Sequence, residues 1–293
     1  MEMIIIEEKY YKVWLTLIKN LGFKKYINLI KKFKNHKAIF NASKEKLQEV
    51  PLIDEKMAEK ILDVVTRKRV LNHIKYMQAN NIDIIDIFDK DYPYYLKEIY
   101  SPPICLYVKG DKSILNGINI GIVGCRDCSK YGIEVAKDFS YNLAKHKLNI
   151  VSGLAKGIDA YAHCGAVLAK GKTIAVLGNG LDTIYPEENR NLANKIISGG
   201  GAIISEYPLG TKPEKANFPA RNRIISGMSK GIIVVEAKKK SGTIITVDFA
   251  LEQGRDVFVV PGNINSINSE GTNDLIKQGA RLVTSFEDVL EEL

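Results

Sequence analysis

After Gly117 the sequence repeats one pattern: a short run of β-branched and other apolar residues, then a glycine, then a segment with helical spacing. This alternation predicts βαβ units around a parallel sheet. The runs are apolar almost without alternation, as expected for strands that helices cover on both faces. The predicted strands are 118–123, 148–151, 173–177, 202–205, 231–236, 256–260 and 281–283.

The first third of the chain has a different pattern. Apolar residues recur there at helical spacing, which predicts a small all-helical domain over residues 1–80. An aromatic stretch broken by prolines follows, and we interpret residues 81–110 as an ordered connector that ends in a strand at 104–108. The parallel sheet then occupies a third segment, residues 111–293.

The composition, 45% apolar and 26% charged, is typical of globular proteins, and 293 residues allow two cores. No apolar run approaches the ~20 residues of a membrane helix, and the N-terminus does not resemble a signal peptide. We therefore expect a cytoplasmic protein without a membrane partner. The four cysteines are too few for a disulfide scaffold, so we expect reduced thiols.

The net charge is +8, and most of the excess lies before residue 111. A polyanion is a reasonable partner for such a chain. A lysine-rich, AT-rich genome would produce the same bias without any function, and charge alone does not separate the two explanations.

The loops that follow the strands are candidate phosphate sites, because ligands of such sheets bind beyond the carboxyl ends of the strands. In the first loop Gly124 lets the backbone approach a ligand, Arg126 can reach a phosphate, and Ser129 can cap the next helix. The alternative is that Arg126 is simply solvated at a loop tip.

The second loop places Ser152 and Gly153 beside Lys156, a combination that suits an anion. His163, one turn into the following helix, is more often a packed or hydrogen-bonded histidine than a ligand. The third loop contains Gly180, which either contacts a phosphate or only makes a turn.

The fourth candidate element is split between two segments. Arg221, Asn222 and Arg223 are consecutive, and one arginine can bind a ligand while the other pairs internally with an acidic residue. A second segment opens a helix with small residues after a run of lysines, which again favours an anion. Its candidate residues are Lys240, Ser241, Gly242 and Thr243.

Several cofactor motifs are absent. The dinucleotide fingerprint fails because Thr183 stands where its third glycine belongs, and the run from Gly165 to Gly171 has the wrong spacing for a P-loop. Cys125 and Cys128 lie at a strand-to-helix turn, where a thiol pKa is lowered, so redox chemistry is a minor alternative. We find no further zinc ligands nearby, and we expect neither a metal nor a cofactor.

Seven motifs, in order over residues 118–283, resemble the DNA-processing protein DprA (Smf) family. They are IVGCR, SGLAKGID, AVLGNGLDTIYP, ISEYPLG, NFPARNRIISGMS, SGTIITVDFALEQGRDVFVVPG and GTNDLIKQGA. The resemblance implies an extended Rossmann-like α/β domain with helices on both faces, which binds single-stranded DNA, dimerises and loads RecA recombinase in natural transformation. It implicates Gly124, Arg126, Ser152, Lys156 and the segment 221–223 in DNA binding.

Three departures from related patterns refine this expectation. The family usually has serine at Cys125, so the cysteine pair looks incidental. The N-terminal half resembles the family's helix-hairpin-helix or sterile-alpha-motif region, but Leu52 and Asp54 replace the glycines that let a hairpin backbone approach phosphate. We therefore assign this region to interaction or scaffolding. No winged-helix domain is expected after residue 293.

Two rival functions use the same fold. In the nucleotide-cleaving LOG family a catalytic glutamate stands where this chain has Thr246, so we expect no enzyme activity and no catalytic residue. A sensor of small nucleotides stays open. For a homodimer, the helices around 243–253 and 285–292 are candidate interfaces.

Overall fold

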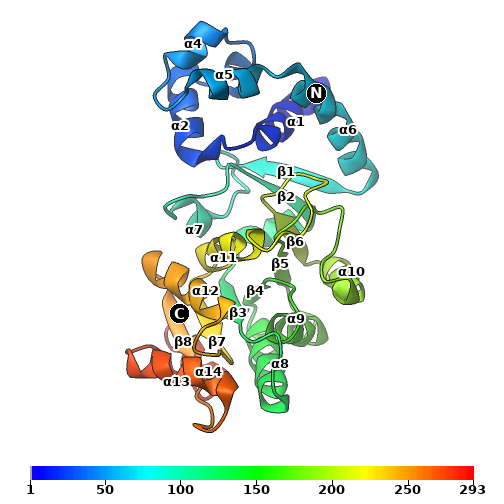
Figure 1. Ribbon diagram of the computed structural model, residues 1–293. Coiled ribbons are helices and arrows are strands. Elements are labelled where there is room, and N and C mark those ends of the chain that lie inside the picture. Colours follow the sequence, from blue (N-terminus) through cyan, green and yellow to red (C-terminus); the bar gives the residue numbers. More distant parts are fainter. Residues whose placement is uncertain (1) are drawn as a thin grey trace.

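The computed structural model describes residues 2–293, with side chains from Glu8 onward. Met1, part of the predicted helical domain, lies outside the described residues. The N-terminal helices lie against one end of an α/β part that contains a large sheet (Figure 1).

Residues 2–79 are helical, as the apolar spacing predicts. Short polar side chains start the helices: Asp54 accepts a hydrogen bond from the Met57 amide at 2.8 Å, and Asp63 accepts one from the Thr66 amide at 2.7 Å. The helices are α1 (Glu2–Leu17), α2 (Gly22–Phe33), α3 (His36–Phe40), α4 (Lys44–Gln48), α5 (Glu55–Leu62) and α6 (Val64–Ala79).

The strands of the described residues form one nine-stranded sheet of order β1-β2-β6-β5-β4-β3-β7-β8-β9. All neighbours from β6 to β9 are parallel, which confirms the predicted α/β fold. The strands are β1 (Ile82–Asp86), β2 (Cys105–Gly110), β3 (Asn119–Val123), β4 (Asn149–Ser152), β5 (Thr173–Val176), β6 (Ala202–Ser205), β7 (Gly231–Val234), β8 (Asp256–Val259) and β9 (Arg281–Leu282).

The segment 81–110, which we expected to be a connector, contributes two strands to this sheet. The sequence pattern predicts β2 but not β1. The two strands form an antiparallel pair, and β2 is antiparallel to β6, with Tyr107 opposite Ser205. They extend the parallel sheet, and α1 and α6 contact β1.

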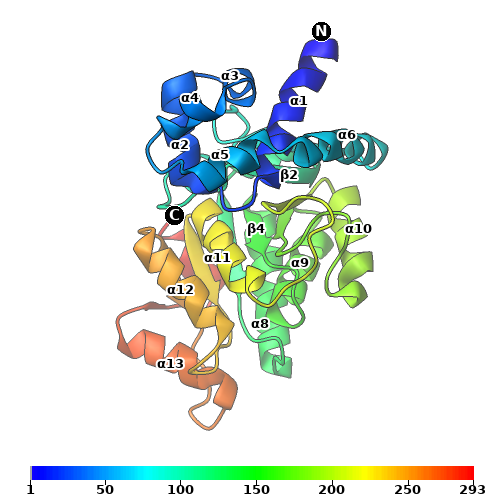
Figure 2. The ribbon, with the colours of Figure 1, turned by 45° about the horizontal axis from the view of Figure 1, so that its top comes forward.

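Helices cover both faces of the sheet. Ile120 and Ile122 of β3 pack with α8 and α9 on one face, whereas Val123 and Val234 pack with α11 and α12 on the other. Figure 2 shows α11 and α12 side by side. The helices of this part are α7 (Tyr94–Lys97), α8 (Lys130–Lys145), α9 (Ile158–Leu168), α10 (Arg190–Ser198), α11 (Asn217–Met228), α12 (Gly242–Glu252), α13 (Glu270–Lys277) and α14 (Phe286–Leu290). Single turns of 3₁₀ helix lie at 112–116, 187–189 and 267–269.

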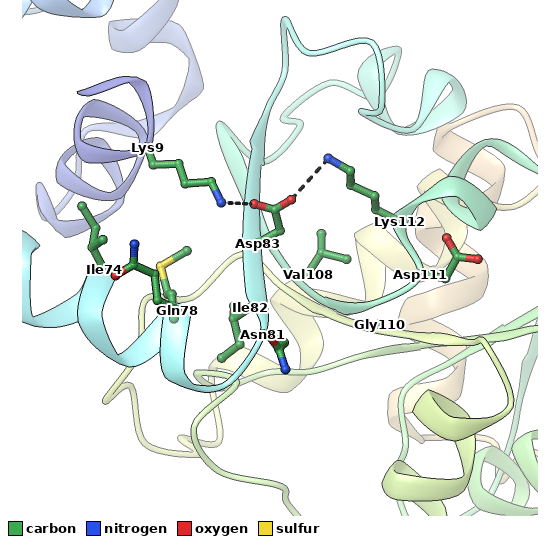
Figure 3. A pocket seen from close by; sticks show the side chains of 11 residues that line it. Lys9, Ile74, Gln78, Asn81, Ile82, Asp83, Val108, Gly110, Asp111 and Lys112 are labelled. Atoms are coloured by element: carbon green, nitrogen blue, oxygen red, sulfur yellow. Dashed lines mark hydrogen bonds and ion pairs between the residues drawn. The ribbon is translucent and has the colours of Figure 1, made fainter. Parts of the chain in front are cut away.

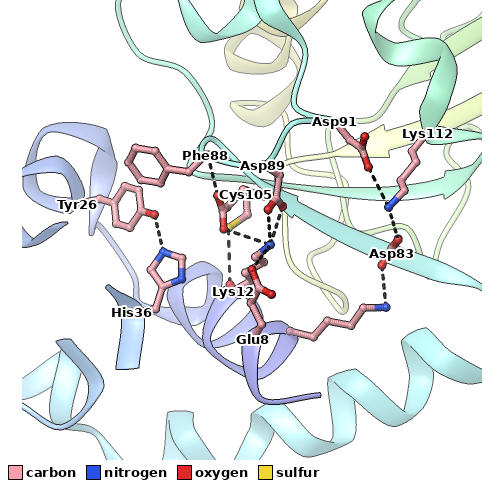
Figure 4. A network of polar contacts seen from close by, with 12 residues as sticks. Glu8, Lys12, Tyr26, His36, Asp83, Phe88, Asp89, Asp91, Cys105 and Lys112 are labelled. Carbon is pink, nitrogen blue, oxygen red and sulfur yellow. Dashed lines mark hydrogen bonds and ion pairs between the residues drawn. The ribbon is translucent and has the colours of Figure 1, made fainter. Parts of the chain in front are cut away.

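A buried ion cluster joins the helical part to the sheet (Figure 4). Lys12 of α1 is 5% exposed, and its ammonium lies 2.6 Å from Asp89 and 3.3 Å from Asp86. Asp86 is also buried, at the end of β1. This buried charge pair holds α1 against β1, the outermost strand on this side of the sheet.

Among residues 2–293, no helix combines the length and the apolar character needed to cross a membrane.

Candidate functional site

The predicted site residues come together at one edge of the sheet. Strands β6, β5, β4, β3 and β7 are parallel neighbours, so the loops that follow them leave the sheet at the same edge. These loops are 124–129, 153–157, 177–186, 206–216 and 235–241. We call them the loop cluster.

Arg126 is the exposed cation of the first loop. Its guanidinium carbon lies 5.8 Å from the centre of the Phe218 ring, and it has no carboxylate partner among the described residues. Gly124 is constrained by packing, because a Cβ there would approach the Ile158 side chain to 2.6 Å. Ser129 accepts a hydrogen bond from the Gly132 amide at 3.1 Å, which confirms the predicted helix cap.

In the second loop, Ser152 and Gly153 have structural partners. The Ser152 hydroxyl is buried and donates to the Ile122 carbonyl at 2.7 Å, and the Gly153 amide donates to Asp159 at 3.1 Å. Lys156 is exposed, and its ammonium lies 2.6 Å from Glu188. Any phosphate that reaches Lys156 therefore competes with this carboxylate.

Gly157 ends the second loop with a backbone that favours glycine. Its φ is +73°, and a Cβ would collide with the carbonyl oxygens of Cys125 and Arg126. The first two loops are thus in direct backbone contact, which holds Arg126 in place.

Arg221 is buried under the loop cluster and is 4% exposed. Its guanidinium donates to the Gly153 carbonyl at 2.8 Å and to the Val176 carbonyl, so it ties the second loop to the end of β5. Burial lowers the pKa of Arg221 to about 10, and the nearby Asp159 opposes this effect. Burial also raises the pKa of the Asp159 carboxyl.

Arg223 pairs internally with an acidic residue, as predicted for one of the two arginines. Its guanidinium donates to both carboxylate oxygens of Glu206, at 2.8 and 2.6 Å. Burial alone would lower the pKa of Arg223, but Glu206 outweighs this effect and the pKa is raised. With Arg221 buried as well, neither arginine is an open cation in this conformation.

The start of α12 is open. Lys240 is exposed, and a Cβ added at Gly242 would meet nothing within 4 Å. The Ser241 hydroxyl is buried and has no hydrogen-bond partner among the described residues, and Thr243 is buried behind it. Asn222 donates to the Gly242 carbonyl at 3.3 Å, which joins α11 to this helix start.

Tyr185 of the third loop lies beside Phe218 of α11, and the sequence pattern did not single out either ring as a stacking residue. Tyr185 is 46% exposed, and its ring centre lies 5.6 Å from that of Phe218 at an interplanar angle of 34°. Gly180 is tightly packed, since a Cβ there would approach the Pro208 carbonyl to 2.7 Å. The signal for Phe218 was its position just before the Arg221–Arg223 segment at the start of a helix.

Two lysines of the loop after β6 were also missed. Lys212 and Lys215 are exposed, and neither has a carboxylate partner among the described residues. Together with Arg126 and Lys240 they make the loop cluster basic. Base stacking on aromatic rings between such cations is a common way to hold single-stranded nucleic acid.

Neither His163 nor the cysteine pair is set up to bind a ligand or to react. The Nδ1 of His163 hydrogen bonds to the Thr173 hydroxyl at 2.7 Å, and burial lowers the pKa of His163 to about 3, so the ring is neutral. Burial raises the pKa of both Cys125 and Cys128, so the lowered thiol pKa expected at this turn is wrong. Burial outweighs any effect of the helix start.

A cavity of about 420 Å³ lies away from the loop cluster, between α1, α6 and the edge strands (Figure 3). Its Asp83 pairs with Lys9 at 2.8 Å and with Lys112 at 3.2 Å, and it contains none of the predicted site residues. Glu8, Asp86 and Asp89 are close enough to share a metal ion, but the Lys12 ammonium already contacts all three carboxylates.

The chain is similar to known proteins over most of its length. Residues 83–293 match the model of the family described as DNA recombination-mediator protein A. The DNA processing protein DprA of Bacillus subtilis is 47% identical over 217 residues, which cover 74% of this chain and 73% of that protein.

Two solved structures are similar as well. DNA processing protein A from Streptococcus pneumoniae superimposes with a TM-score of 0.83 at 37% identity, covering 97% of this chain and 98% of that one. DNA processing protein A from Helicobacter pylori, described for its single-stranded DNA binding mode, gives a TM-score of 0.65 at 30% identity, covering 72% and 94%.

Proposed function

The chain belongs to the DNA recombination-mediator protein A (DprA/Smf) family, and from this premise we propose that it is a non-catalytic mediator that binds single-stranded DNA. In this role it protects incoming DNA and loads RecA recombinase during natural transformation. We propose Gly124, Arg126, Ser152, Gly153, Lys156, Gly180, Arg221–Arg223 and Lys240–Thr243 as its DNA site, with Phe218 and Tyr185 added as stacking rings. In this proposal the exposed Arg126, Lys156 and Lys240 contact the DNA, and the buried members of the set hold the loops in place.

One observation supports this proposal above the others: an exposed arginine lies against a pair of aromatic rings at the carboxyl edge of the sheet. Arg126, Phe218 and Tyr185 come from three separate segments, yet the Phe218 ring centre lies 5.8 Å from the guanidinium and 5.6 Å from the Tyr185 ring. Stacking contributes about 1–3 kcal/mol per base, and lysines at the rim attract the phosphates. Within this arrangement, the buried Arg221 supports the loops and Arg126 contacts DNA.

Two buried carboxylates in and beside the loop cluster already have structural partners, which supports a non-catalytic role. Asp159 accepts a backbone hydrogen bond, and Glu236 accepts two from the amide and hydroxyl of Ser129. A general acid or nucleophile must reach its substrate. Thr246, where the LOG family has its glutamate, is buried and has no carboxylate.

Homodimerisation, the RecA contact, a role in competence and a cytoplasmic location remain proposals that follow from the family. For the dimer we keep the helices around 243–253 and 285–292 as candidate surfaces. Leu251 is exposed on the first of these, which leaves an apolar side chain available to a second copy.

An electrophoretic shift that compares single-stranded DNA, double-stranded DNA and mononucleotides at two salt concentrations tests the function. We expect single-stranded DNA to bind most tightly and to displace double-stranded DNA from the protein. Competition by a mononucleotide at micromolar concentration would instead favour a nucleotide sensor. Release of free base from a nucleoside monophosphate, above a no-protein control, would show an enzyme of the LOG type.

The Arg126→Glu variant tests the site. We expect it to weaken single-stranded DNA binding far more than Arg190→Glu, because Arg126 lies on the aromatic stack whereas Arg190 pairs with Glu187 outside it. Removing one phosphate interaction should also reduce the salt slope by about 0.7. Fluorescence anisotropy of a labelled oligonucleotide measures both, and equal losses of affinity would mean that general charge, not this loop, binds DNA.

A further inference from the structure

The segment before β2 reaches the same edge of the sheet as the loop cluster. Strand β2 is antiparallel to β6, with Tyr107 opposite Ser205, so the chain that enters β2 lies where β6 ends. Tyr100 and Ser101 belong to this entering segment. They therefore border the loop that follows β6.

A pocket of about 370 Å³ opens between this segment and the helical part. Its walls come from the start of α2, from Leu52 in the hairpin between α4 and α5, and from the Tyr100 segment. The lining residues are Asn20, Leu21, Gly22, Phe23, Lys24, Lys25, Leu52, Tyr100 and Ser101.

The side chains in this pocket match the chemistry of a nucleotide. Tyr100 is 81% exposed, so its ring is free to stack. The Lys24 ammonium lies 4.8 Å from the ring centre and donates to the Tyr100 hydroxyl at 2.7 Å, while Lys25 donates to the Asn20 carbonyl at 3.1 Å. Neither lysine has a carboxylate partner among the described residues, so both charges are available to a phosphate.

Arg223 links the pocket to the loop cluster. Arg223 donates to the Ser101 carbonyl at 3.1 Å and to Glu206, the first residue after β6. Arg223 lies on α11, whose second residue is the proposed stacking residue Phe218. The Tyr100 segment is thus hydrogen bonded to the same helix that carries Phe218.

We propose that this pocket is a second contact for the same DNA strand, with one base stacked on Tyr100 and its phosphates held by Lys24 and Lys25. The inference rests on the proposed function and extends it to the helical part of the chain. In this contact the phosphates are held by side chains and not by the backbone of the hairpin between α4 and α5. In that hairpin Leu52 has a φ of +71°, and its apolar side chain is 60% exposed. Leu52 then packs beside the base.

Oligonucleotides of two lengths test this contact: about 6 nucleotides, near the lower end of the site sizes usual for single-strand binders, and about 20 nucleotides, above their upper end. We expect Tyr100→Ala to weaken the longer oligonucleotide about fivefold or more and to leave the shorter one within about twofold, because the shorter one fits on the loop cluster alone. The double variant Lys24→Ala, Lys25→Ala should lower the salt slope for the longer one by about 1.4, or about 0.7 per phosphate.

The control variants make the tyrosine change and a single lysine change elsewhere. Tyr141, on α8, also lies under a lysine, with the Lys145 ammonium 5.5 Å from its ring centre, and Lys46 is an exposed lysine of α4. We expect Tyr141→Ala and Lys46→Ala to leave both affinities unchanged.

The outcomes separate the two proposals. If the unmodified chain binds neither oligonucleotide, the proposed function is wrong. If it binds both and Tyr100→Ala changes the longer one no more than Tyr141→Ala does, the second contact is wrong, and a partner such as an acidic protein segment would better suit the pocket. Because Tyr100, Lys24 and Lys25 lie at the surface, circular dichroism should show unchanged folding in every variant.

Discussion

Lys156 shows that an exposed cation in a candidate DNA site can already be engaged. Its ammonium pairs with Glu188 at 2.6 Å, and both side chains are about half exposed. We predict that Glu188→Gln strengthens single-stranded DNA binding about two- to fivefold at low salt, because the DNA phosphate then no longer competes with a carboxylate for the Lys156 ammonium. Titrations by fluorescence anisotropy measure the change.

The matched control is Glu187→Gln, which removes the same charge one residue earlier, from the Arg190 pair. An equal gain in both variants would mean that overall charge, and not release of Lys156, sets the affinity.

His163 makes the stability of the protein depend on pH. Burial lowers its pKa to about 3, while in the unfolded chain it titrates near 6.5. Between these values the unfolded state binds the extra proton, so the stabilisation is complete above about pH 6.5 and is lost as the pH falls toward 3. We predict a slope of about 1.4 kcal/mol per pH unit from this residue.

Urea titrations at several pH values between about 4 and 6.5 test the His163 prediction. In His163→Gln the loss of unfolding free energy with falling pH should be smaller by about this slope. The same acid dependence in both proteins would assign it to other groups.

Among the elements, α1 depends on Lys12 for its place on β1. Lys12 and Asp86 are both buried, and removing one partner of a buried pair leaves the other charge unpaired. We predict that Lys12→Met lowers the free energy of unfolding by about 3–5 kcal/mol. Lys9→Met, which breaks the more exposed pair with Asp83, should cost less than about 1 kcal/mol, and equal losses in urea titrations would contradict this interpretation.

The parallel strands were predictable from sequence because each is a nearly uninterrupted apolar run followed by glycine. Strand β1 was missed because Asp83 and Asp86 interrupt its apolar residues. Each aspartate forms an ion pair with a lysine of α1: Asp83 with Lys9, and Asp86 with Lys12. A partner so distant in sequence cannot be found from local pattern.

The same reason limits the prediction of the site. The glycine loops and Arg126 are local patterns and were found. The burial of Arg221 depends on carbonyl oxygens from two other segments, and the stack of Tyr185 on Phe218 joins residues 33 positions apart, which only the fold brings together. The proposed DNA contacts of all these residues stay predictions.

For the whole molecule, the shared sheet changes where the chain can be divided. We propose that residues 1–80 are a unit of their own, but β1 and β2 belong to the same sheet as β3–β9. A fragment of residues 81–293 retains all nine strands, and one of residues 111–293 lacks β1 and β2. We predict that the first unfolds cooperatively on heating, followed by circular dichroism, and that the second does not.

The full chain is the control for this comparison and should unfold at a higher temperature than either fragment, because its α1 covers β1. If the shorter fragment unfolds as sharply as the longer one, residues 111–293 fold without β1 and β2, and the domain boundary near residue 110 is correct.

The pairing of β2 with β6 also has a consequence for synthesis on the ribosome. Strand β2 ends at Gly110, but its partner β6 ends only at Ser205. At about 5–20 residues per second, the ribosome needs about 5–20 s to make the chain between them. During that interval the nascent β1–β2 hairpin exposes an open strand edge, which is the feature of partly made proteins that chaperones shield from aggregation.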